Sequence, residues 1–139
     1  MKIVFLDRAT ISLETVVRAP GFTHEWVTFD RTTMEDAAAR IADADIVVVN
    51  KVRLSAQTLA GAKKLKLIAV AATGTDNIDL SACQQRGIVV SNVRNYALHT
   101  VSEHTFALIF ALRRSICAYR DAVKAGRWQE ARGETVLLF

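Results

Sequence analysis

The stretch best suited to chemistry is ATGTDNIDL, residues 72–80, which follows an apolar run and precedes a predicted helix. It holds small residues and a single glycine, Gly74, so the backbone can come close to a ligand there. Backbone N–H groups that lead into a helix can point together at a negative charge. The pattern therefore predicts an anion site, suited to a carboxylate, at Thr73 and Gly74.

The same residues allow a purely structural interpretation. Gly74 can serve a turn, while Asp76, Asn77 and Asp79 can cap the helix that follows, because short polar side chains readily hydrogen-bond to nearby backbone. By residue type alone this interpretation is at least as good as an anion site, and both stay open.

Other residues that could do chemistry lack the necessary spacing. The six glycines never form G-x-G-x-x-G, the pattern that cradles a dinucleotide pyrophosphate. Cys83 and Cys117 have no metal-binding or redox spacing, and we interpret both as reduced, buried thiols of an intracellular protein. His24, His99 and His104 also lack metal spacing, which favours surface or structural roles. The sequence predicts no metal site.

Alternating strands and helices would position these residues. Five short runs of apolar and β-branched residues predict strands. Three segments between them predict helices, with Thr33 and Ser55 as N-caps of two and Gly87 as the left-handed end of the third. The predicted strands are 2–7, 25–30, 45–51, 65–72 and 88–93, and the predicted helices are 34–44, 55–64 and 80–87.

This alternation predicts a parallel sheet with helices on both faces, because crossover connections are right-handed. For five strands we expect a doubly wound α/β domain with the flavodoxin-like order 2-1-3-4-5. Ligands of such domains bind beyond the carboxyl ends of the strands. Here those ends are Asp7 and residues 50–52, 72–74 and 92–96.

Residues 99–128 differ in kind, since they predict one long helix that ends near Gly126. The apolar positions spread over more than one face, which is typical of a helix buried between two bodies of protein. We expect another surface to cover them, and we predict a homodimer through this helix. These positions are Val101, Phe106, Leu108, Ile109, Leu112, Ile116, Tyr119 and Val123.

The composition is that of a globular protein. Hydrophobic residues make up 51% and charged residues 23% of the 139 residues, a balance that disordered chains lack. The first residues have no signal-peptide pattern, and no run approaches the ~20 apolar residues of a membrane span. We therefore expect a soluble, cytoplasmic protein. The net charge of +4 comes mostly from scattered residues, which predicts no binding to nucleic acid.

Residues 65–114 carry a family resemblance. The segments TGTDNIDL, GIVVSNV and EHTFALIFALRR occur there in order, and the chain resembles the D-isomer-specific 2-hydroxyacid dehydrogenases, most closely the glycerate dehydrogenase/hydroxypyruvate reductase type. The similarity extends from MKIVFLD at the start to GRWQ, which ends at residue 129. One departure is Ser102, where many relatives have proline, although serine also favours helix starts.

The resemblance implies an oxidoreductase with two α/β domains and the active site between them. One domain is flavodoxin-like and binds substrate, and the other is Rossmann-like and binds NAD or NADP. Residues 1–98 would form the substrate domain, and the helix at 99–128 would begin the nucleotide domain.

The resemblance also implies roles for particular residues. The backbone of Thr73 and Gly74 would bind the substrate carboxylate, and Lys51 and Val52 would line the same cleft. Tyr96 matches an aromatic residue near the substrate of some relatives.

Thr105 matches a position close to the nucleotide. The resemblance matches none of the 139 residues to the family's catalytic arginine, glutamate and histidine, and we expect the NAD-binding domain to be absent. The tail at 129–139 ends in GETVLLF and departs from the family. If a possible coding sequence for GETVLLF is read in a frame shifted by one base, it encodes Ala-Arg-Gln-Phe-Cys-Phe. This peptide resembles the segment with which the family continues. We expect a truncated dehydrogenase that binds no cofactor and does not transfer hydride between 2-hydroxy and 2-keto acids by itself.

The alternative is a non-catalytic, flavodoxin-like binding module or a receiver-type module, since receivers have this size and strand order. A receiver's phosphoacceptor site needs carboxylates after the first and third strands and a lysine after the fifth. Asp7 meets this pattern, but Asn50 and Arg94 stand at the other two places. These residues favour the dehydrogenase.

Overall fold

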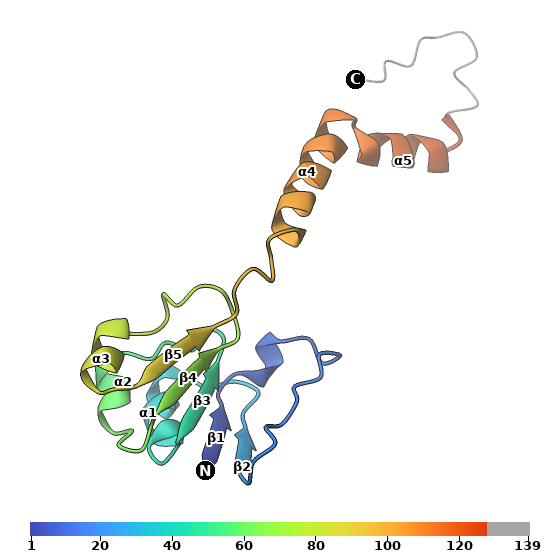
Figure 1. Cartoon of the computed structure of the whole chain (residues 1–139). Coiled ribbons are helices and arrows are strands. Elements are labelled where there is room, and N and C mark those ends of the chain that lie inside the picture. The colour runs from blue at the N-terminus through green and yellow to red at the C-terminus, as the bar shows by residue number, and fades with distance from the viewer. Residues whose placement is uncertain (128–139) are drawn as a thin grey trace. The chain divides into compact units, whose positions relative to one another are not determined.

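The computed structural model describes residues 1–127, and these fall into two compact parts, Met1–Arg94 and the part that begins at Asn95 (Figure 1). The first part holds the sheet with its helices, and the second holds two further helices. The predicted tail at 129–139 lies outside the described residues. The assignment of residues 1–98 to a substrate domain stays a prediction, although the first compact part ends close to that boundary.

The first part is built on a five-stranded parallel sheet in the order β2-β1-β3-β4-β5, which confirms the predicted order. Each strand is a short run rich in β-branched residues, which suits a pleated surface. The strands are β1 (Lys2–Phe5), β2 (Glu25–Thr28), β3 (Ile46–Val49), β4 (Leu67–Val70) and β5 (Val89–Asn92).

Local signals place the helices of this part. Side-chain oxygens of Thr33 and Ser55 each accept a hydrogen bond, 3.2 Å long, from the backbone N–H three residues ahead, as N-caps do. Gly87 has φ of +68°, the left-handed conformation predicted after the third helix. The helices are η1 (Arg8–Thr10), α1 (Met34–Ile41), α2 (Ala56–Ala60) and α3 (Leu80–Gln85).

All three α-helices of the first part pack on one face of the sheet. The core there joins the strands to Ile41 from α1, Leu59 from α2 and Cys83 from α3. Alternate residues of a strand point to opposite faces, so one set of strand side chains fills this core. The central members are Val4, Leu6, Val47, Val49, Ile68 and Val70.

The opposite face carries the β1–β2 connection, residues 8–24. A right-handed crossover requires this connection to lie opposite the helices, because the chain moves from β1 to the neighbour on the other side (Figure 1). Ile3 and Phe5 are buried on this face, whereas Val89 on β5 is 61% exposed. Within residues 1–94 the α-helices therefore cover one face only, and the other face has the short 3-10 helix η1 in the β1–β2 connection.

The second part contains α4 (Thr100–Arg113) and α5 (Ile116–Lys124). The prediction of one continuous helix over 99–128 is wrong, because Ser115 adopts a left-handed conformation with φ of 49° and ψ of 38°. A left-handed residue ends the helical hydrogen-bond pattern, and a new helix starts after it. The predicted end at Gly126 is found, since its φ is +73°.

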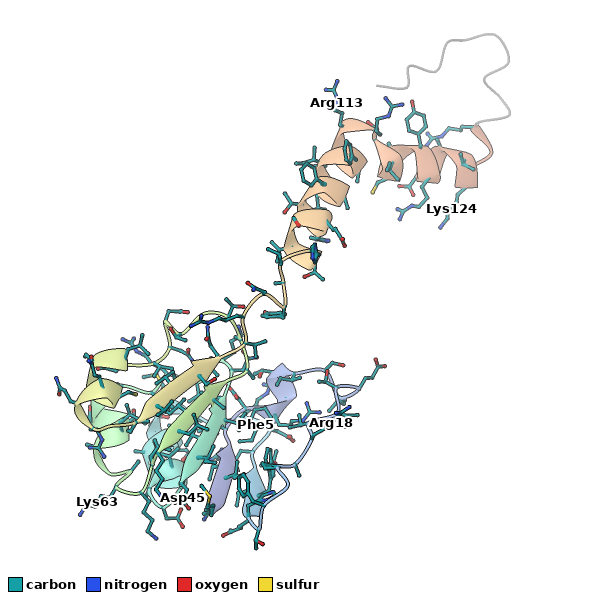
Figure 2. The ribbon with its side chains drawn as sticks, in the orientation of Figure 1. Phe5, Arg18, Asp45, Lys63, Arg113 and Lys124 are labelled. Atoms are coloured by element: carbon teal, nitrogen blue, oxygen red, sulfur yellow. The ribbon has the colours of Figure 1, made fainter. Side chains whose placement is uncertain are left out.

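Apolar side chains of α4 and α5 are exposed within the described residues (Figure 2). Their exposed fractions run from 49% to 80%, and the set comprises Val101, Phe106, Leu108, Ile109, Phe110, Leu112, Ile116 and Val123. Cys117 is exposed too, so the prediction of two buried cysteines holds for Cys83 alone. No helix among residues 1–127 is long and apolar enough to span a membrane.

Candidate functional site

Asp7 anchors the loop that follows β3. It lies just after β1 and is 2% exposed. Its carboxylate accepts hydrogen bonds from three consecutive backbone N–H groups: Asn50 (2.9 and 3.1 Å), Lys51 (2.6 Å) and Val52 (3.0 Å). Charge-assisted bonds of this kind are strong. They fix the loop at 50–52 and leave its three amides unavailable to a ligand.

Asn77 ties the loop after β4 to the loop after β3. Its Nδ2 donates to the backbone oxygens of Val52 (3.0 Å) and Asn50 (3.4 Å). Two backbone bonds continue the connection, from Leu54 N–H to Asn77 O (2.8 Å) and from Asp79 N–H to Leu54 O (3.0 Å). The carboxyl ends of β3 and β4 thus form one connected edge.

Residues 73–76, called the 73–76 loop below, lie at this edge. The loop is fastened to the end of β5, because the Thr73 hydroxyl donates to Val93 O (2.9 Å) and Asn92 Nδ2 donates to Thr73 O (2.7 Å). Within the described residues, none of the four backbone N–H groups of the loop donates to a protein acceptor. Several free amides in a loop held at both ends can bind an anion.

Space, rather than a left-handed conformation, restricts position 74. A Cβ on Gly74 would lie only 2.8 Å from Oδ1 of Asp76. The Asp76 carboxylate therefore lies beside the backbone of Gly74, and its negative charge opposes a bound anion. Asp76 is exposed, so its side chain has room to turn away when a ligand arrives.

The helix-capping interpretation is correct for one of its three residues. Asp79 caps α3, since its Oδ1 accepts hydrogen bonds from Ala82 N–H (2.9 Å) and the Ser81 hydroxyl (2.8 Å). The bond from Ala82, followed by that from Ser81, lowers the pKa of Asp79 below its ordinary value. Asn77 bridges two loops instead, and Asp76 makes no capping bond. Free amides and a capped helix coexist in this segment.

The structure places Lys51 and Val52 beside this edge. Both line a cavity of about 470 Å³ at the carboxyl ends of β1 and β3. Lys51 is exposed, while Val52 is half-buried against the core. Together with Thr73 and Gly74, these two predicted residues lie on loops joined by the hydrogen bonds of Asn77.

Tyr96 and Thr105 belong to the second part of the chain. Tyr96 is exposed in the turn before α4. The Thr105 hydroxyl donates to the backbone oxygen of Val101 within α4 (2.8 Å). Neither observation tests the roles that the family resemblance implies for them.

One glycine pattern of dinucleotide-binding loops does not occur among the described residues. Residues 1–127 contain isolated glycines only, so no G-x-G-x-x-G loop is present to cradle a pyrophosphate. The same residues contain no group of three or more histidine, cysteine or acidic side chains that could hold a metal ion. Among the described residues, the free amides of the 73–76 loop are suited to binding an anion.

Sequence reasoning missed the residues that hold the site together. Asp7 was noted as a strand end, and Asn77 as a possible helix cap, but their bonds to the 50–52 loop join segments 25 to 45 residues apart. Asn92, which fixes the Thr73 end of the 73–76 loop, carried no signal beyond its place at the end of a strand. A polar residue at the carboxyl end of a buried parallel strand was the available clue.

Comparison with known proteins identifies the family. The sequence profile of the D-isomer-specific 2-hydroxyacid dehydrogenase catalytic domain matches residues 3–134. The chain is 47% identical over 132 residues to glycerate dehydrogenase of Methylorubrum extorquens, a match that covers 94% of this chain and 41% of that protein. It is 29% identical over 108 residues to hydroxypyruvate reductase of Blautia hydrogenotrophica, covering 76% of this chain and 34% of that protein.

A solved structure agrees with these matches. The NAD⁺-bound 3-phosphoglycerate dehydrogenase of Entamoeba histolytica superposes with a TM-score of 0.63 and 29% sequence identity, over 84% of this chain and 40% of that one. The chain thus spans about two fifths or less of the length of each of these relatives. Because the family profile covers nearly all its residues, the chain belongs to the D-isomer-specific 2-hydroxyacid dehydrogenase family, in the catalytic-domain part.

Proposed function

We propose that this chain is the substrate-binding part of an NAD(P)-dependent oxidoreductase that transfers hydride between a 2-hydroxy acid and a 2-keto acid. The type we favour is glycerate dehydrogenase/hydroxypyruvate reductase, because both names occur among its relatives. The observation that carries the proposal is the row of free amides in the 73–76 loop. They lie at the carboxyl edge of a parallel sheet, where such folds bind ligands.

The 73–76 loop binds the substrate carboxylate in this proposal. Hydrogen bonds to a charged group contribute about 1.5–3 kcal/mol each, so two or three amides can hold a small acid. Thr73 and Gly74 supply the first of them, while Asp7 and Asn77 position the neighbouring loop. Lys51 adds positive charge, and Val52 supplies an apolar wall. The nicotinamide cofactor supplies or accepts the hydride when it is bound.

The remaining family roles are proposals for the second part of the chain. Tyr96 would approach the substrate, and Thr105 the nucleotide. The catalytic arginine, glutamate and histidine implied by the resemblance have no counterpart in these 139 residues. We therefore expect the 139 residues by themselves to show no loss of NADH absorbance with hydroxypyruvate, and robust turnover would contradict that expectation.

The proposal includes a homodimer through α4. Its apolar side chains are exposed on several sides, with Leu112 at 80%, and such surfaces are normally covered by association. Light scattering in dilute solution should give the mass of two chains, and a clean monomer would contradict the dimer. A cytoplasmic location belongs to the same proposal.

A receiver-type module is the weaker alternative. Its phosphoacceptor carboxylates must be available to a metal ion and a phosphoryl group. The carboxylate of Asp7 is buried and accepts four hydrogen-bond contacts from the loop at 50–52. It is therefore committed to a structural role.

Carboxylate binding can be tested by titrating the ¹⁵N-labelled chain with D-glycerate and following backbone amide shifts. We expect saturable shifts at residues 73–76. Glycerol, which has the same carbon chain and no carboxylate, is the matched control and should leave these amides in place. Equal shifts with both compounds, or none with D-glycerate, would overturn the proposed role of the loop.

A further inference from the structure

The carboxylate of Asp76 lies beside the amides to which an anion would bind. Its Oδ1 is 2.8 Å from the point that a Cβ on Gly74 would occupy. Within the described residues the Asp76 side chain makes no hydrogen bond or ion pair, and it is exposed. Two carboxylates in the same place repel each other. The Asp76 side chain must therefore move before the 73–76 loop can bind a carboxylate.

A small pocket that Asp76 itself lines offers a place for that carboxylate. The pocket has a volume of about 140 Å³ and is lined by residues 53–55 and 76–79. The parallel bridge between Leu54 and Ile78 holds these two segments side by side. Sites for small molecules have volumes of about 300–1,000 Å³, so this pocket is small for a ligand. A water molecule takes up about 30 Å³ and a carboxylate is only slightly larger, so the pocket has room for a side-chain carboxylate.

Arg53 is the one cationic residue in the lining of this pocket. It is exposed, and its guanidinium makes no hydrogen bond or ion pair within residues 1–127. Asp79 is the other acid of the lining besides Asp76, but its Oδ1 already accepts hydrogen bonds from Ala82 N–H (2.9 Å) and the Ser81 hydroxyl (2.8 Å) as the cap of α3. Among the described residues, the pocket thus brings together one unpaired cation and one unpaired carboxylate, on segments that are fixed beside each other.

We propose that Arg53 is a positioning residue of the anion site, which takes up the Asp76 carboxylate when a ligand carboxylate binds to the 73–76 loop. Rotation of the Asp76 side chain moves its carboxylate away from Gly74 and into the small pocket. The planar guanidinium can bind both carboxylate oxygens there, which offsets the repulsion between the two acids. The inference rests on the proposed function, because the ligand is the 2-hydroxy acid assigned to the loop. Arg53 acts through Asp76 and does not touch the ligand.

A double-mutant cycle on the ¹⁵N-labelled 139-residue chain separates this role from direct contact with the ligand. Wild type, Asp76→Asn, Arg53→Gln and the double variant are titrated with D-glycerate, and the amide shifts of residues 73–76 give the dissociation constants. Arg53→Gln should weaken binding about threefold in the wild-type background, as expected for an exposed ion pair, and should have no effect once Asp76 is Asn. Arg53→Lys, which keeps the charge, should retain most of the affinity.

Lys63→Gln is the matched control for the loss of one positive charge. Lys63 is an exposed cation in the loop after α2 (Figure 2), and it does not line the small pocket. Its replacement should leave D-glycerate binding unchanged in both backgrounds. Because Asp76, Arg53 and Lys63 are all exposed, the variants should keep the wild-type fold, which the dispersion of their amide spectra checks.

The side-chain Nε–H signal of Arg53 reports the ion pair directly. It should shift when D-glycerate is added to wild type and stay in place in Asp76→Asn. Equal weakening by Arg53→Gln in both backgrounds would overturn the inference, because Arg53 would then act on the ligand itself, and it would leave the proposed function intact. The same holds if Arg53→Gln changes binding in neither background. No D-glycerate shifts at residues 73–76 in any of the proteins would overturn the proposed function and the inference together.

Discussion

Replacing Asp7 by alanine should destabilise the first part of the chain and release the loop at 50–52. The substitution removes the acceptor for three backbone N–H groups, at 2.6 to 3.1 Å. A buried donor left without an acceptor costs about 1–3 kcal/mol. Asp7 lines an open cavity, so water can reach part of the gap, and the low end applies. Three donors at about 1 kcal/mol each give a loss of about 3 kcal/mol.

Urea unfolding followed by circular dichroism measures this loss. With a urea dependence of about 1.5–2 kcal/mol per molar for a small domain, the midpoint should fall by about 1.5–2 M. Asp7→Asn keeps one acceptor oxygen and should lose about half as much free energy. Asp30→Ala is the matched control, since Asp30 is exposed and its side chain makes no hydrogen bond in the described structure; it should change stability by less than about 0.5 kcal/mol. A midpoint for Asp7→Ala no lower than that of Asp30→Ala would refute the anchoring role.

Three further predictions concern single side chains. Asp76→Asn should tighten D-glycerate binding about threefold in the amide titration, because two unit charges ~6 Å apart in water repel by about 0.7 kcal/mol; weaker binding would mean that Asp76 helps to hold the ligand. The pKa of Asp79 is lowered in the folded protein, which adds stability that is present above its unfolded pKa and is lost as the pH falls through its folded pKa. The free energy of unfolding of wild type should therefore fall more steeply than that of Asp79→Asn below about pH 4. Parallel acid-unfolding curves for the two proteins would contradict this. Burial raises the pKa of the Cys83 thiol. A thiol reagent should therefore modify the exposed Cys117 at once and Cys83 only as fast as the protein opens. Equal rates of modification at the two thiols would contradict the burial of Cys83.

Features set by near neighbours in sequence were predictable. The N-caps at Thr33 and Ser55 involve a residue three positions ahead, so a short window of sequence contains both partners. The alternation of strands and helices implies right-handed connections and a parallel sheet, and the flavodoxin-like order is the one expected for five such strands. The 73–76 loop was recognisable because small residues and a glycine at the end of a strand form a local pattern.

Features set by distant residues were not predictable in the same way. The bonds from Asp7 to the loop at 50–52 join residues more than 40 positions apart, and no periodicity records them. Arg31 and Arg53 line the same cavity at the carboxyl ends of β1 and β3, but they lie in separate connections that only the folded sheet brings together. The break at Ser115 escaped notice because the apolar pattern continues across it and serine lacks the freedom of glycine that usually marks such a position.

A crystal structure of the chain grown with D-glycerate would test the central claim most directly. We predict that the carboxylate lies within about 3 Å of at least two backbone nitrogens of residues 73–76, with the loop at 50–52 still bonded to Asp7. The contradictory result would be glycerate bound elsewhere in the chain while the 73–76 amides remain open to solvent.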